Sequence, residues 1–98
     1  MIKEQEIYAA GMEIMSRAAI DIPEDYREGL RGMLEKEEEE LSRFVLMSML
    51  DNWEAAEEDR RAMCADTGVP RYFVKIGNEA KIDGGPVALE RALRRATA

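Results

Sequence analysis

Residues 63–77 read MCADTGVPRYFVKIG, and this stretch decides how the chain is organised. Before it, apolar residues follow helical spacing, whereas residues 71–76 alternate in the way typical of a half-buried strand. The stretch also holds Cys64, the only cysteine of the chain. A soft, ionisable side chain on a turn between two regular elements is a common place for chemistry. This stretch is therefore the first candidate for a functional site.

Helical periodicity covers most of the remaining chain. Apolar spacing predicts helices over residues 2–19, 23–36 and 38–60, and a Gly-Pro pair predicts a last helix from residue 85. The predicted fold is mainly α (α+β), with three to four helices and one short strand or ribbon. That strand cannot satisfy its edges alone and is expected to pair with another segment, inside or outside this chain. The third helix is apolar around more of its circumference than so short a chain can cover, which predicts a partner.

The composition narrows the classes of function. With 98 residues the chain is one domain at most, and its net charge of −7 disfavours binding to nucleic acid. There is no His, which excludes Ser-His-Asp and Cys-His nucleophiles and His-based zinc sites within the chain. A single cysteine forms no internal disulfide, and no apolar run is long enough to span a bilayer. We expect a cytoplasmic protein that does not bind membranes.

Two readings remain open for each of three residues of the turn. Cys64 is either a small buried hydrophobic residue or a thiolate ligand to iron, and one cysteine does not by itself specify a cluster. Asp66 either accepts local backbone N–H bonds in a turn or hydrogen-bonds a substrate. Gly68 supplies a positive φ or allows a close backbone approach.

The motif Cys64-x-Asp66-Thr67-Gly68, the strand-like segment 72–77 and the helical stretch 52–56 together resemble a known family. They are similar to class I, iron–sulfur-dependent fumarate hydratases and to the alpha subunit of L(+)-tartrate dehydratases, from about residue 23 to the end. The resemblance implies that Cys64 is one of three thiolates holding a [4Fe–4S] cluster. It also implies that Asp66, with Ala65 and Thr67 beside it, contacts a bound dicarboxylate. Ala65 departs from the family, where glutamine is common, and this leaves the substrate open.

The resemblance further implies that residues 1–98 are a single N-terminal helical segment of a larger Fe–S hydro-lyase domain, either a fragment or a split subunit. Such a chain would be inactive alone and would hold no catalytic base. Its partners would be the remaining alpha-type and beta-type polypeptides, and its substrate a small dicarboxylic acid of the fumarate/malate or tartrate type. The alternative is a non-catalytic helical assembly subunit that keeps the family scaffold.

Overall fold

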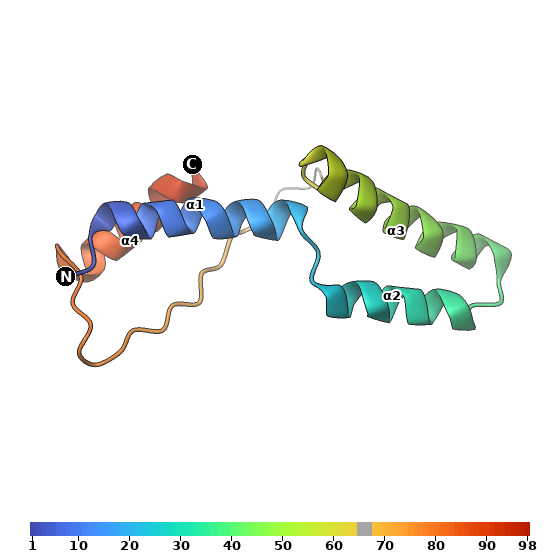
Figure 1. Cartoon of the computed structure of the whole chain (residues 1–98), viewed down its shortest axis with the longest axis horizontal. Coiled ribbons are helices and arrows are strands. Elements are labelled where there is room, and N and C mark those ends of the chain that lie inside the picture. Colours follow the sequence, from blue (N-terminus) through green and yellow to red (C-terminus); the bar gives the residue numbers. More distant parts are fainter. Residues whose placement is uncertain (65–67) are drawn as a thin grey trace. The chain divides into compact units, whose positions relative to one another are not determined.

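The computed structural model describes residues 1–64 and 68–98 and is mainly helical, as the sequence predicts (Figure 1). The helices are α1 (Glu4–Ile20), α2 (Glu24–Lys36), α3 (Glu40–Asp59) and α4 (Gly85–Thr97). All four predicted helices are therefore confirmed, with ends that differ by at most two residues. The chain forms two compact units, one of Met1–Ser16 with Asp66–Ala98 and one of Arg17–Ala65. In the described ranges, no helix is both long and apolar enough to cross a membrane.

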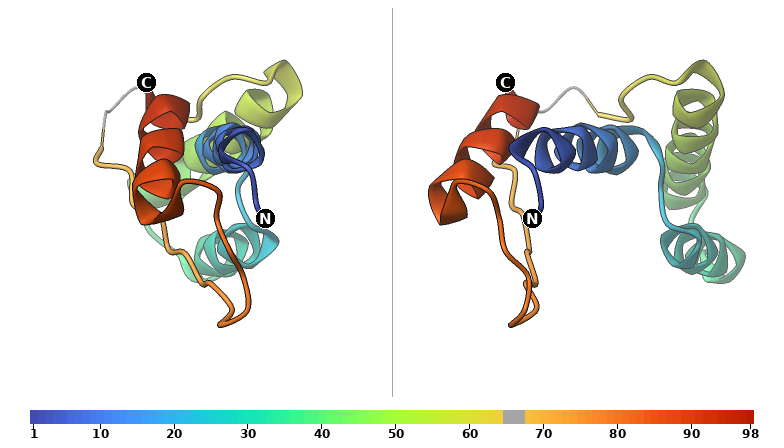
Figure 2. Two further views of the ribbon diagram at one scale, coloured as in Figure 1. Left: turned by 90° about the vertical axis from the view of Figure 1, so that its left-hand side faces the viewer. Right: turned by 60° about the vertical axis from the view of Figure 1, so that its left-hand side comes forward.

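In the first unit α1 and α4 lie side by side (Figure 2), and small residues pack between them. Ala88, Ala92 and Ala96 recur every fourth residue of α4 and are all buried. Gly11 of α1 is buried against them, and a Cβ built there would lie 2.8 Å from the Cβ of Ala96. Only a glycine allows the two backbones to come so near.

Charged side chains join the same two helices. Both guanidinium nitrogens Nε and Nη2 of Arg91 donate to the Glu4 carboxylate, at 2.8 and 2.6 Å. This hydrogen bonding holds the pKa of Glu4 below its ordinary value, since it favours the charged form. The guanidinium carbon of Arg95 lies 4.6 Å from the centre of the Tyr8 ring, a cation–π contact.

The extended N-terminus is tied to the segment before α4. The N–H of Ile2 donates to the carbonyl of Lys81 at 2.8 Å, and the N–H of Asp83 donates to the carbonyl of Ile2 at 2.9 Å. The result is an isolated parallel bridge between Ile2 and Ile82. Gly84 then turns the chain into α4 with a φ of +86°, which a residue with a Cβ rarely adopts.

The strand predicted over residues 71–76 is not formed, and no strand occurs within residues 1–64 and 68–98. The segment is not helical either. Among residues 71–76 only Tyr72 is half-buried, and its hydroxyl forms a hydrogen bond of 2.8 Å with the hydroxyl of Thr97. Phe73 is 95% exposed. The prediction fails because alternation specifies a strand only where a second segment supplies the ladder of hydrogen bonds.

The second unit is a hairpin of α2 and α3. The side chains between the two helices are only partly buried, and Ala56 is the one buried residue of α3. Arg27 of α2 forms an ion pair with Glu57 of α3. At the turn, the guanidinium of Arg43 donates to the carbonyls of Leu34 and Glu37 at 2.7 and 3.0 Å, which caps the end of α2.

Candidate functional site

The candidate site begins where α3 ends, just before the cysteine. The N–H of Arg61 donates to the carbonyl of Ala56 at 2.9 Å and the N–H of Arg60 to that of Glu57 at 3.4 Å. These two bonds and the left-handed φ of 53° at Arg60 form a Schellman motif. Arg60 also donates to Asp21 at 2.9 Å, so the turn is fixed by backbone and side-chain bonds together.

The residue before the cysteine is held from both sides. The N–H of Met63 donates to the carbonyl of Ala19 at 3.0 Å, and the amide Nδ2 of Asn52 donates to the carbonyl of Met63 at 2.7 Å. Neither contact follows from motif reading, although Asn52 opens the helical stretch that carries the family resemblance. The main chain that leads into Cys64 is therefore positioned by two other segments of the same unit.

The side chain of Cys64 is exposed. Within this chain Cys64 is therefore not a core residue, and its exposure is compatible with a side chain that binds a ligand. The other three predicted site residues, Ala65, Asp66 and Thr67, lie outside the described residues.

The described part of the chain contains no group of three or more Cys, Asp or Glu side chains that would hold a metal ion. Cys64 could supply at most one sulfur ligand. A [4Fe–4S] cluster takes its ligands mainly from several cysteines, so the others would have to come from outside these residues.

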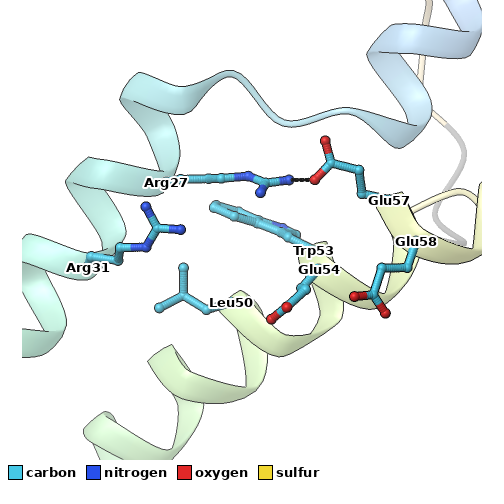
Figure 3. Close-up of a pocket in the computed structure, with 7 residues that line it drawn as sticks. All are labelled: Arg27, Arg31, Leu50, Trp53, Glu54, Glu57 and Glu58. Carbon is cyan, nitrogen blue, oxygen red and sulfur yellow. Dashed lines mark hydrogen bonds and ion pairs between the residues drawn. The ribbon is translucent and has the colours of Figure 1, made fainter.

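Two hollows lie in the same unit as Cys64. One, of about 550 Å³, has Met63 in its wall together with Arg17, Ala18, Asp21, Ile22, Pro23, Tyr26 and Trp53. The other, of about 450 Å³, lies between α2 and α3 and is lined by Arg27, Arg31, Leu50, Trp53, Glu54, Glu57 and Glu58 (Figure 3).

The second hollow brings together charges that are far apart in the sequence. Arg27 is only 16% exposed, and its Nε has no hydrogen-bond partner. Its other end is neutralised by Glu57, and two further glutamates line the wall. A dicarboxylate entering here would meet more carboxylates than free guanidinium groups, so we regard the hollow as structural.

The chain is similar to known proteins of one family. The family model described as "Fumarate hydratase (Fumerase)" matches residues 9–98. A Methanocaldococcus jannaschii protein named "Putative L(+)-tartrate dehydratase subunit alpha" is 41% identical over 66 residues, which are 67% of this chain. The match spans 23% of that relative's length. No solved structure matches the chain. Because the family model covers all but the first eight residues, the chain belongs to the fumarate hydratase (fumerase) family.

Proposed function

We propose that the chain is one component of an iron–sulfur hydro-lyase that reversibly hydrates and dehydrates a small dicarboxylic acid. The observation that carries the proposal is the family match over residues 9–98. The relative named as a tartrate dehydratase subunit supports the same chemistry. Since this chain spans 23% of that relative, the complete activity would require further polypeptide.

In this proposal Cys64 supplies one thiolate to a [4Fe–4S] cluster. Its exposure and the two hydrogen bonds that fix Met63 support the role, because a ligand on a fixed main chain loses little freedom on binding. When bound, such a cluster supplies an iron that acts as a Lewis acid on the substrate hydroxyl. Asp66, with Ala65 and Thr67, would lie beside the dicarboxylate, a role that rests on the family resemblance alone.

This chain would contribute no catalytic base. The base, the cationic groups that hold the substrate carboxylates and the other cluster cysteines would come from the remaining alpha-type and beta-type polypeptides. A beta-type partner is suggested by the designation "subunit alpha" in the relative's name. The chain alone is therefore expected to show no hydro-lyase activity.

Replacement of the thiol tests the proposal. We expect Cys64→Ser to abolish iron and acid-labile sulfide in the assembled enzyme purified without oxygen, and with them turnover of fumarate, malate and tartrate. Met63→Leu, a volume-conserving change at the adjacent residue, is the matched control and should keep both. Full iron content in the Cys64→Ser assembly would overturn the ligand role.

A non-catalytic assembly subunit is the second candidate. It is favoured by the large apolar side chains that α3 leaves in solvent, among them Leu41 and Phe44 at 68% and 67% exposure. Under this alternative, Cys64→Ser would leave both the cluster content and the activity of the assembly unchanged.

A further inference from the structure

The outer stripe of α3 consists of Leu41, Phe44, Val45, Ser48 and Met49, at helical positions i, i+3, i+4, i+7 and i+8. Its apolar members range from 68% to 40% exposed. The hydroxyl of Ser48 donates to the carbonyl of Phe44 at 2.8 Å, so the one polar member has its hydrogen bond within the helix. The stripe therefore presents a nearly continuous apolar surface.

This stripe takes no part in the α2–α3 hairpin. The face of α3 that is partly buried carries Leu46, Leu50 and Trp53, which recur at i, i+4 and i+7. On a helix of 3.6 residues per turn, those positions lie on the side opposite the stripe. A long apolar stripe that the hairpin does not cover is typical of a helix that packs against a second partner.

Charge distinguishes between the partners that could cover the stripe. The helix α3 has six acidic residues, of which Glu54, Glu57 and Glu58 line the hollow toward α2. Its one basic residue, Arg43, is already bound to carbonyls at the end of α2. Arg17–Ala65 as a whole carries 14 Asp and Glu against 7 Lys and Arg, whereas the rest of the chain carries 7 of each. A second copy would bring like charges together, whereas a helix with Lys or Arg beside its apolar face would complement them.

The stripe also runs toward the cysteine. Asn52 lies one turn beyond Ser48 on the same side of α3, and its amide holds the carbonyl of Met63. A helix lying along the stripe would thus extend to the turn that presents Cys64.

We infer that the outer stripe of α3 docks an amphipathic helix with Lys or Arg along its margins, contributed by the polypeptide that completes the hydro-lyase. The inference rests on the proposed function for the identity of the partner. Recognition by spaced apolar anchors on one helix is the helix-in-groove mode. The docked helix would bring its polypeptide next to the one cluster ligand that this chain supplies.

Photo-cross-linking in the native host tests the inference. The photoreactive residue p-benzoylphenylalanine is placed at Phe44 and, as a control, at Met33, an apolar residue of α2 that is 58% exposed and lies outside the stripe. We expect position 44 to label a helical segment flanked by Lys or Arg in a cysteine-containing polypeptide, and position 33 not to label it. A cross-link to a second copy, to residues 1–16 or 66–98 of the same chain, or to no segment at all would overturn the inference.

A pair of substitutions adds a quantitative test. Phe44→Glu should lower the amount of the partner polypeptide that co-purifies with this chain by about tenfold or more, since an anchor of this size loses its apolar burial. Met33→Glu should leave recovery unchanged, and circular dichroism should show unaltered helix content in both. Equal recovery for the two variants would refute the docking surface.

Iron and sulfide content is measured in the same preparations. A complex that forms through Phe44 but holds no cluster would defeat the proposed function and leave the docking surface standing. A complex that holds a cluster and is recovered equally well with Phe44→Glu would leave the proposed function standing and defeat the docking surface.

Discussion

Replacing Gly11 by alanine should destabilise the α1–α4 unit, although the same change normally strengthens a helix. The new Cβ would lie 2.8 Å from the Cβ of Ala96 and 3.3 Å from Cδ2 of Leu93. Because carbon atoms in contact settle at about 3.5–4.0 Å, the helices would have to separate by roughly 1 Å. Overpacking of this kind costs about 1–3 kcal/mol, against a helix-propensity gain of about 1 kcal/mol for Gly→Ala.

The control is the same substitution in α2. A Cβ on Gly29 meets nothing within 4 Å, so Gly29→Ala should gain about 1 kcal/mol without any clash. The difference between the variants then isolates the overpacking term of about 1–3 kcal/mol. Urea unfolding followed by circular dichroism gives both values, and amide hydrogen exchange assigns each change to its helices. The reasoning is refuted if Gly11→Ala stabilises the chain as much as Gly29→Ala does.

The double variant Gly11→Ala/Ala96→Gly restores the space that the first change fills. We expect the two substitutions to couple favourably, by about 1 kcal/mol or more, because residues in direct contact are not additive. Strict additivity would show that the contact between the two Cβ positions does not limit the packing of α1 on α4.

Two further predictions concern single hydrogen-bonded contacts. Asn52→Ala removes the donor to the Met63 carbonyl, a bond of about 0.5–1.5 kcal/mol, and should speed hydrogen exchange at the Met63 N–H by about twofold to tenfold; unchanged protection would contradict the role of Asn52 as a clamp. Arg91 lowers the pKa of Glu4, so the unfolded chain takes up a proton at higher pH than the folded one. This contribution is complete above the ordinary glutamate pKa of about 4.3 and is lost as the pH falls through the lower folded value. The thermal midpoint of the α1–α4 unit should fall over that acidic window, and it should fall less steeply in Glu4→Gln.

Local pattern was sufficient to predict the helices, because each has its own apolar spacing and two of them also have a start signal. The Gly-Pro pair marked the start of α4, and proline at residue 23 stands immediately before α2. Residues 71–76 show the limit of such reasoning, since a strand depends on a partner segment that their own sequence does not specify. The missing ladder, and not the alternation, explains why they are not a strand here.

The motif of the candidate site could be read from the sequence, whereas the contacts that hold the main chain before Cys64 could not. Cys64 was singled out because it is the only cysteine and an acid and a glycine follow it two and four residues later. It is exposed, just after a turn that is held by hydrogen bonds. The bond from Asn52 to Met63 spans 11 residues and that from Met63 to Ala19 spans 44, so neither follows from local pattern. Such hydrogen bonds depend on how distant segments pack, which cannot be predicted from the local pattern of a single sequence.

The bridge between Ile2 and Ile82 has a consequence for the order of events during synthesis. The α1–α4 unit joins segments that are far apart in the sequence, since Glu4 pairs with Arg91 and Gly11 packs on Ala96. Contacts this distant in sequence form late, whereas the α2–α3 hairpin has everything it needs by residue 64. We therefore expect α1 to leave the ribosome before α4 and to keep the face around Gly11 uncovered until α4 has emerged.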